Sequence, residues 1–361
     1  MRRALVVLAA ALATLAVAWP ASGAPTAGGV TVFAGPPLAK PAVAHSDALA
    51  FFPRAVTIHA GDTVTWHVLG FHTVTFSGRY RPYPFVTPTG KQPLVKDATG
   101  APFWWAGHAP VLDISPLTLL QQGGASISSP AQVRSSGLIR VIAAPPNTAP
   151  QPYSLTFTVP GVYHYRCAVH PGMRGVVVVV PASKPVPSAA QELAAAQSAV
   201  KRAVVDMHAL SKTRAAGALR VLVGTGHNST GAELTSFFPA RLSVHVGSTV
   251  RFVNHDQTDI HTVTFGPEKL RSAIEAGFAA PRGHEVILNA LGALPSEPPG
   301  TRATYDGASH GNGYLSSGIL QPQGAPSVAG TKSFAVTFTK AGVYHYECVV
   351  HKNMDGTIVV R

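Results

Sequence analysis

An internal repeat limits the fold of this chain more than any other feature of its sequence. The motif FFP, followed by an alternating stretch and a glycine, occurs twice, and so does the identical motif HTVTF. A third motif, GVYHY-x-C, also occurs twice and follows the other two in the same order each time. The matching segments are residues 51–61 and 237–247, 72–76 and 261–265, and 161–167 and 342–348. The chain is therefore expected to contain one domain copied twice.

Each copy is expected to be a β-sandwich. Short apolar runs alternate with a period of two residues and are bounded by Gly, Pro or polar turns. Only 12% of the 361 residues are charged, whereas Gly and Pro number 34 and 31, which suits an all-β, loop-rich protein. Long Gly/Pro-rich inserts separate the middle strands from the last ones in both copies. In the first copy the strands are expected near residues 56–58, 63–68, 73–76, 155–159, 162–167 and 176–180.

A segment of different character joins the two copies. Residues 181–187 are rich in proline and predict an extended linker. Ser188 with Gln191 three residues later is typical of a capping box, and an apolar stripe then predicts a helix to about Arg214. We interpret this helix as a structural connector, and we expect a second, short helix within residues 267–278. The expected boundaries are 25–183 for the first domain, 184–217 for the linker and helix, and 218–361 for the second domain.

The N-terminus has the pattern of a secretory signal peptide over residues 1–24. Arg2 and Arg3 precede an apolar run at residues 4–18, and small residues follow Pro20. The run is shorter than the roughly 20 residues that a membrane span needs. We therefore expect an exported chain, secreted, periplasmic or on the cell surface, without a stable membrane span after signal cleavage.

The chain is basic, which bears on its partners. Loss of Arg2 and Arg3 with the signal lowers the formal net charge from +12 to +10. Such a charge either aids solubility or attracts acidic partners and anionic surfaces. Nucleic acid is not expected as a partner, because an exported chain without a basic run has little access to it. Redox partner proteins with acidic surfaces are the expectation.

The residues with the most chemical content form the motif C-x-x-H-x-x-M, which also occurs twice. Each motif follows a predicted strand, and each copy has a histidine at the head of its HTVTF strand. One thiolate, two imidazoles and a weak axial thioether are the diagnostic ligands of a blue-copper electron-transfer site. The expected metal ligands are His72, Cys167, His170 and Met173 in the first copy, and His261, Cys348, His351 and Met354 in the second.

Other roles suit these residues less well than copper binding. A disulfide between Cys167 and Cys348 would suit an exported chain, but each cysteine has its own set of neighbouring ligands. Zinc seldom uses methionine, and a Cys-His nucleophile lacks an orienting third group. His67 is the one serious competitor of His72 as first ligand, and His72 is preferred because it aligns with His261.

Several further histidines are not expected to bind this metal. Strand alternation should point two of them away from the thiolate, and the remaining three lie in the inserts, where we expect surface positions. These residues are His164, His345, His108, His284 and His310.

The repeated FFP, HTVTF, GVYHY-x-C and C-x-x-H-x-x-M motifs together resemble the cupredoxins, the plastocyanin and amicyanin group. The tight C-x-x-H-x-x-M loop is most similar to that of amicyanin. The resemblance covers about half of each copy, its strands and its metal loop, and omits the inserts. It implies two tandem Greek-key β-sandwiches, each with one type 1 copper. The chain departs from plastocyanins at Thr73 and Thr262, where those proteins often have asparagine.

Three functions follow from this interpretation. The preferred one is an exported electron carrier with two type 1 coppers. The second is a copper oxidase or nitrite-reductase-like enzyme, in which a histidine typically adjoins the ligand cysteine; here Arg166 and Glu347 hold those places, and no H-x-H pair occurs. The third is copper storage or delivery. Neither the distance between the two sites nor the oligomeric state follows from the sequence.

Overall fold

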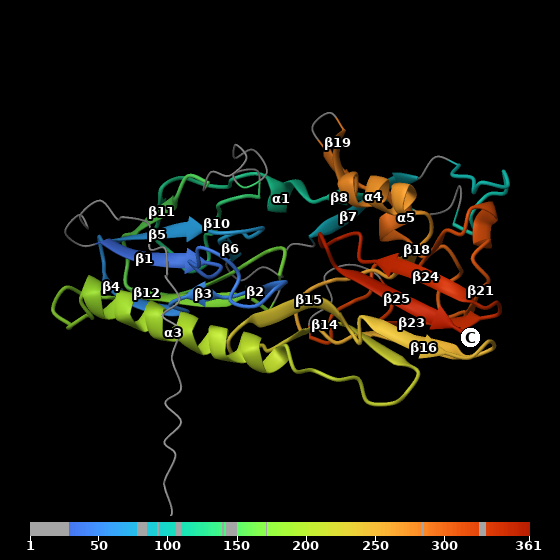
Figure 1. Ribbon diagram of the computed structural model, residues 1–361. Coiled ribbons are helices and arrows are strands. Elements are labelled where there is room, and N and C mark those ends of the chain that lie inside the picture. The colour runs from blue at the N-terminus through green and yellow to red at the C-terminus, as the bar shows by residue number, and fades with distance from the viewer. Residues whose placement is uncertain are drawn as a thin grey trace, which may run out of the picture.

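The computed structural model describes residues 29–77, 85–91, 94–105, 110–138, 141, 150–170, 172–282, 285–324 and 330–361. The predicted signal peptide and the insert histidines His108 and His284 lie outside these ranges. Two β-sandwiches lie side by side, and one long helix runs along the first and reaches the edge of the second (Figure 1).

The first sandwich consists of two five-stranded sheets. Strand alternation explains its core: Val64, Trp66 and Val68 of one strand are buried, whereas the residues between them are only partly covered. One sheet has the order β3 (Phe51–Phe52), β1 (Gly29–Ala34), β5 (Thr63–Val68), β11 (Tyr153–Phe157), β9 (Ser126–Ile127). The other has the order β10 (Val133–Ser135), β6 (Thr75–Ser77), β12 (Gly161–Arg166), β13 (Arg174–Val180), β4 (Ala55–His59).

The second sandwich repeats this arrangement with one addition. Its first sheet has six strands in the order β2 (Ser46–Ala48), β15 (Ala232–Phe238), β14 (Arg220–Gly226), β17 (Thr249–Asn254), β23 (Ser333–Phe338), β21 (Ala303–Tyr305). The facing sheet has the order β16 (Arg241–Val244), β25 (Asp355–Val360), β24 (Gly342–Glu347), β18 (Thr264–Phe265), β22 (Leu315–Ser316). The added strand, β2, comes from the first copy. The all-β fold expected from the sequence, with two cupredoxin-like sandwiches, is confirmed.

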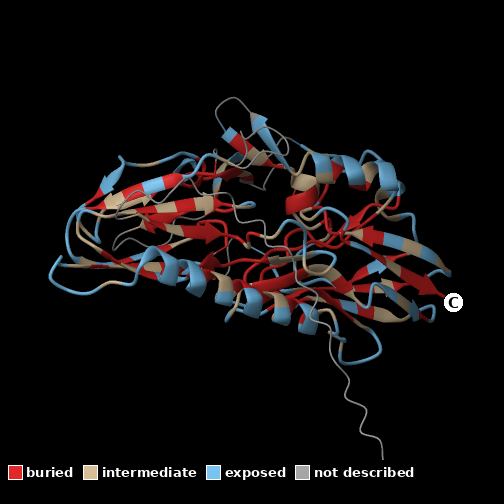
Figure 2. Cartoon of the chain, turned by 60° about the vertical axis from the view of Figure 1, so that its left-hand side comes forward, coloured by how far each residue is buried: buried red, intermediate tan, exposed pale blue. Residues whose placement is uncertain are grey.

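The two copies are joined by more than this strand. A third sheet combines their inserts in the order β19 (Ala279–Arg282), β20 (Glu285–Leu288), β8 (Pro110–Ile114), β7 (Val86–Lys91). Ile260, Val286 and Ile319 of the second copy belong to the core cluster of the first. Buried residues consequently continue from one sandwich into the other (Figure 2). The helices of the inserts are α1 (Pro116–Leu119), α4 (Glu268–Ala276), α5 (Ala290–Ala293) and the 3-10 helix η1 (Ser309–Gly311).

The connector helix α3 (Ala189–Leu210) begins as expected but ends earlier than the predicted Arg214. Ser188 and Gln191 form the capping box that the sequence indicates. The stripe is rotated slightly from the predicted one, because Leu193 is exposed and Glu192 is buried instead, where its carboxylate accepts the backbone N–H of Thr57 at 3.1 Å. The buried face of α3 packs on Phe33 and Phe52 of the first copy and on residues of β15 in the second, so the helix contacts both domains.

Two observations bear on the surroundings of the protein. None of the helices in the described ranges has the length and apolar character that crossing a membrane requires.

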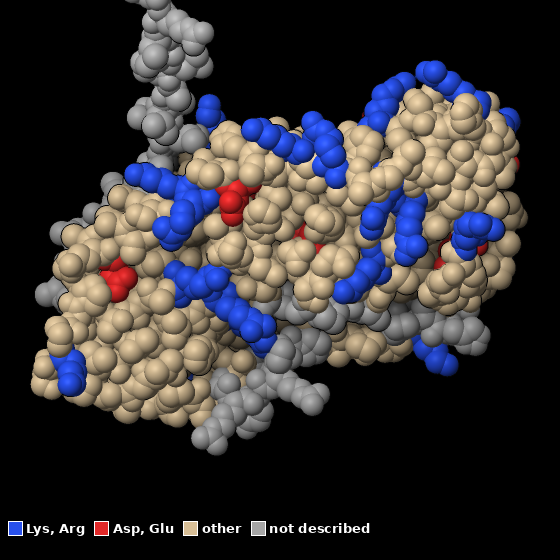
Figure 3. All heavy atoms as spheres, turned by 90° about the horizontal axis from the view of Figure 1, so that it is seen from below, with Lys and Arg blue, Asp and Glu red and all other residues tan. Residues whose placement is uncertain are grey.

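Lys and Arg side chains are spread over the face that Figure 3 presents, with few Asp and Glu among them, in keeping with the formal charge of +12.

Candidate metal centres

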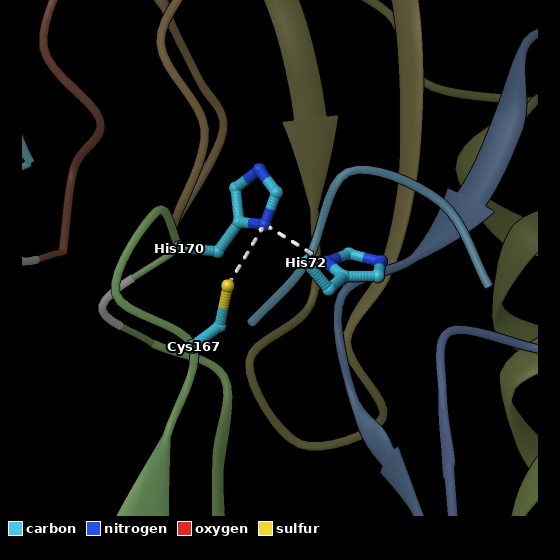
Figure 4. Close-up of side chains that lie close together, drawn as sticks. All are labelled: His72, Cys167 and His170. Atoms are coloured by element: carbon cyan, nitrogen blue, oxygen red, sulfur yellow. Dashed lines mark hydrogen bonds between the residues drawn. The ribbon is translucent and has the colours of Figure 1, made fainter. Parts of the chain in front are cut away.

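The first cluster joins three side chains from two strand ends. His72 stands before β6, and Cys167 and His170 lie in the loop between β12 and β13. The Nδ1 atom of His170 lies 3.1 Å from Nδ1 of His72 and 3.7 Å from Sγ of Cys167, as Figure 4 shows. All three residues are buried. One ring nitrogen from each histidine and the sulfur therefore converge on one small volume, within 4.8 Å of one another.

The second cluster has the same construction. Sγ of Cys348 lies 3.5 Å from Nδ1 of His351 and 3.9 Å from Nδ1 of His261. His261 and Cys348 are buried, whereas the side chain of His351 keeps 20% of its exposure. In both clusters the Nδ1 atoms face the sulfur, which leaves Nε2 of each histidine directed away from the candidate site.

Both cysteines are poised to be thiolates. Burial alone would favour the neutral thiol, but hydrogen bonding and charge from His170, with His72 assisting, hold the pKa of Cys167 well below its usual range. In the second cluster His351 and His261 likewise outweigh burial and lower the pKa of Cys348. The thiolate is the form that binds metal.

Backbone amides and threonine hydroxyls hold each sulfur in place. The N–H of Thr73 points at Sγ of Cys167 at 3.4 Å, and that of Thr262 points at Sγ of Cys348 at 3.3 Å. The hydroxyl oxygens of these threonines accept the N–H of the residue after each cysteine, at 2.8 and 2.9 Å. Threonine thus fastens the metal loop to the neighbouring strand at the position where plastocyanins often have asparagine. Hydrogen bonds to the cysteine sulfur tune the potential of such sites.

The two methionines close their loops from inside the cores. Met173 and Met354 are 0% and 1% exposed and belong to the core clusters of their domains. The backbone N–H of each cysteine donates to the carbonyl of its methionine, at 2.9 Å for Cys167 and 3.0 Å for Cys348. This bond turns the loop back on itself. The structure therefore brings six of the eight predicted ligands into two clusters and buries the other two, while their metal binding stays a prediction.

Two glycines that the sequence analysis did not single out make room for the upstream histidines. A Cβ atom on Gly224 would lie 2.1 Å from Nε2 of His261, and one on Gly35 would lie 2.2 Å from the carbonyl oxygen of Leu69 and 3.3 Å from Nε2 of His72. Both glycines have positive φ, of 64° and 90° respectively. The signal that could have found them is their equal place in the repeat, 37 residues before the histidine in each copy.

The other histidines lie elsewhere. His67 stacks on Phe33 with ring centroids 5.6 Å apart, outside the cluster, and His164 and His345 are exposed. His310 differs from its expected surface position, because it lies between two carboxylates and its side chain is only 16% exposed. Its ring nitrogens are 3.1 Å from Asp97 and 2.9 Å from Glu297, so it joins the two inserts.

Asp259 is a further residue of the site that no motif in the sequence indicates. Its carboxylate lies 2.9 Å from Nε2 of His351 and 3.9 Å from Nε2 of His170. Burial opposes its ionisation, but His351 outweighs burial and lowers the pKa of Asp259. Burial lowers the pKa of His351, but the negative charge of Asp259 has the largest opposing effect, and the pKa of His351 is raised.

Each sandwich holds one buried cysteine and two converging imidazoles, and this donor set suits a soft metal. Residues 224–361 match the model of the copper binding proteins of the plastocyanin/azurin family, which bears out the resemblance seen in the sequence. No curated protein matches the chain.

Solved structures of several cupredoxins align with parts of the chain. Oxidised plastocyanin from Dryopteris crassirhizoma has 19% identity and a TM-score of 0.21, covering 39% of this chain and 99% of its own. A mutant amicyanin in the reduced Cu(I) form at pH 4 has 19% identity and a TM-score of 0.21, covering 42% and 88%. A purple cupredoxin from Nitrosopumilus maritimus has 17% identity and a TM-score of 0.20, covering 39% and 98%.

Proposed function

We propose that this chain is an exported protein that holds two type 1 copper ions and transfers single electrons. One observation carries the proposal: each domain brings one low-pKa thiolate and two histidine ring nitrogens within 4.8 Å of one another, and the loop with the cysteine also carries a buried methionine. His₂Cys with a weak axial methionine is the diagnostic ligand set for blue copper. His72, Cys167, His170 and Met173 would hold one ion, and His261, Cys348, His351 and Met354 the other.

The residues around each cluster suit a carrier because they hold the ligands firmly. The threonine hydroxyl, the amide directed at the sulfur and the cysteine-to-methionine backbone bond fix the loop without help from a metal. Copper bound here would alternate between Cu(I) and Cu(II) and so carry one electron. A cage that changes little between the two states keeps the barrier to electron transfer low. Copper storage or delivery would instead require ready metal exchange.

Export and partners are part of the same proposal. The N-terminal pattern of residues 1–24 supports secretion to the periplasm, the cell surface or the medium. The excess of Lys and Arg over the surface favours redox partners with acidic faces, because opposite charges steer such encounters. Neither nucleic acid nor a catalytic substrate is part of the proposal.

The decisive experiment measures copper content, visible absorption and electron paramagnetic resonance on the mature chain and on two matched variants. We expect two coppers per chain, intense thiolate-to-copper absorption and only type 1 signals. Cys167→Ser and Cys348→Ser should each remove one blue site and leave the other. A colourless protein that takes up zinc equally well would contradict the proposal in favour of metal storage or delivery. An additional type 2 signal would contradict it in favour of an enzyme.

A further inference from the structure

One carboxylate lies between the two candidate metal sites. Oδ2 of Asp259 is 2.9 Å from Nε2 of His351, and its Oδ1 is 3.9 Å from Nε2 of His170. The side chains of Asp259 and His170 are each 8% exposed. A ligand histidine of each domain is therefore directed at the same buried acid, which bridges the two domains.

The loop that carries Asp259 is a departure from the repeat. Three residues separate Val68 from His72 in the first copy, whereas six separate Asn254 from His261 in the second. Two residues before the histidine, the first copy has Gly70 and the second has Asp259. The longer loop is held from within, because Asp256 accepts the backbone N–H of Asp259 at 3.2 Å. The N–H of Ile260 donates to Oδ1 of Asp259 at 2.7 Å and fixes its carboxylate. The second copy thus supplies a single acid for both sites.

The orientation of the histidines suits this acid. Nδ1 of His170 and Nδ1 of His351 face the sulfurs of their own clusters, at 3.7 and 3.5 Å. With the metal on Nδ1, the proton of each ring must be on Nε2, which is the atom directed at Asp259. Ligand histidines commonly donate their second N–H to a carboxylate, which fixes the ring and tunes the metal.

The two sites differ in their access to solvent. His170 is covered by the second domain, where Gly172 of its loop approaches Thr258 so closely that a Cβ would lie 2.0 Å from the threonine methyl. His351 keeps 20% of its side-chain exposure. Val350, beside His351, packs against the cores of both domains. The outer edge of the first site is therefore closed by the second domain, and that of the second site is partly open.

We propose that Asp259 joins the two sites into one relay, in which electrons enter and leave beside His351 and reach the first site through His351, Asp259 and His170. This inference rests on the proposed function. In each internal step one electron leaves Cu(I) at one site and reduces Cu(II) at the other, and no bond is made or broken. The ring N–H groups keep their protons. The external electron comes from, or goes to, a one-electron carrier protein.

The first test uses the copper-loaded full chain and the two cysteine variants. With the second site removed by Cys348→Ser, reduction of the first site by a reduced carrier protein should slow by roughly tenfold or more, a rise of about 1.4 kcal/mol in the barrier, because the second domain closes the first site to direct contact. With the first site removed by Cys167→Ser, reduction of the second site should keep its original rate. Equal rates at the isolated first site and in the intact chain would overturn the relay.

The second test is Asp259→Asn, which keeps the shape and removes the charge. After a pulse of reductant too small to fill both sites, re-equilibration between them should slow by roughly tenfold or more. Both reduction potentials should rise, because a carboxylate stabilises the more positive Cu(II) state, and the rise should be larger at the second site. A substitution that merely loosens the loop would not shift both potentials in this order. Asp306→Asn, a change to an exposed carboxylate, is the control.

The outcomes separate the two proposals. If the unaltered chain lacks blue copper, the proposed function fails. If both sites are blue and Asp259→Asn leaves the rate and both potentials unchanged, the relay fails while the carrier function stands. Should Asp259→Asn lose copper, the two cysteine variants still decide the direction of electron entry.

Discussion

Asp47 and Glu233 lie opposite each other where β2 pairs with β15, and each stands four residues before the FFP motif of its own copy. Equivalent positions of the two copies therefore face each other across an antiparallel pair. On either side of them, Ser46 pairs with Leu234 and Ala48 with Ala232. This is the local arrangement of an isologous interface, in which the same patch is used twice. It joins the two domains edge to edge within one chain.

The first prediction concerns the pKa of Glu233. This side chain is buried, and burial together with the nearby carboxylates, Asp256 foremost, raises its pKa well above the ordinary value. The native state holds the proton of Glu233 more tightly than the unfolded state does. The contribution of this carboxyl to the free energy of unfolding is therefore complete below about pH 4.3, the pKa of Glu in the unfolded state. That contribution is lost as pH rises through the native-state pKa.

Glu233→Gln should therefore flatten the dependence of stability on pH. At pH 8 we expect the variant to exceed the unaltered chain in free energy of unfolding by about 1 kcal/mol or more, the equivalent of one pKa unit. Urea unfolding at pH 5 and pH 8 measures this difference. Glu285→Gln, at an exposed strand position, is the control and should change neither value. An identical pH slope in Glu233→Gln and the unaltered chain would show that the burial of this carboxyl has no energetic consequence.

The second prediction concerns Gly224. A methyl group there would lie 2.1 Å from Nε2 of His261 and displace the ring. Gly224→Ala should lower copper affinity at the second site by about 10- to 100-fold, as loss of a ligand's support does, and leave the first site unchanged. Copper titration followed at the blue absorption band measures both sites.

The matched control for this variant is Gly247→Ala. Gly247 also has positive φ, of 84°, but faces open space. Both variants should lose about 1–2 kcal/mol of stability from the left-handed backbone, and only Gly224→Ala should lose metal. If the two variants lost copper affinity equally, backbone strain rather than contact with His261 would be the cause.

Much of the fold is predictable because its signals are local. Period-two alternation places β5 and β12 close to their observed bounds, and Ser188 with Gln191 marks the start of α3. The two clusters could be anticipated because duplication preserves spacing between cysteine, histidine and methionine while neighbouring residues change. Glycines at the metal sites leave only a weak trace, since a glycine fits many roles.

What could not be predicted depends on contacts between the copies. Strand β2 carries no mark that it joins the sheet of the other domain, because edge pairing is decided by which surfaces meet. Asp259 lies in a loop without apolar periodicity, and only the meeting of the domains brings it to His170. The rotation of the α3 stripe, with Glu192 buried and Leu193 exposed, depends on another tertiary contact, because the backbone N–H of Thr57 in the first domain donates to the carboxylate of Glu192.

The third prediction concerns the ion pair beside the second site. Nε of Arg271 in α4 donates to Oε2 of Glu347 at 3.0 Å, and both side chains are mostly covered, at 9% and 13% exposure. Glu347 immediately precedes Cys348. Burial raises the pKa of Glu347, and Arg271 opposes this rise. Arg271→Met would leave a covered carboxylate without its cation. We expect a loss of about 2–3 kcal/mol at pH 8, somewhat below the cost for a fully buried pair because some solvent remains.

The double variant Arg271→Met with Glu347→Gln should recover much of this loss, because no unpaired charge then remains. A double-mutant cycle in urea at pH 8 gives the coupling between the two side chains. The same cycle at pH 5 tests how this loss depends on pH. The loss in free energy of unfolding caused by Arg271→Met should be smaller at pH 5, because the pKa of Glu347 is raised further in the variant and its carboxyl takes up a proton. A cost that is the same at both pH values would mean that Arg271 stabilises α4 through packing of its stem rather than through its charge.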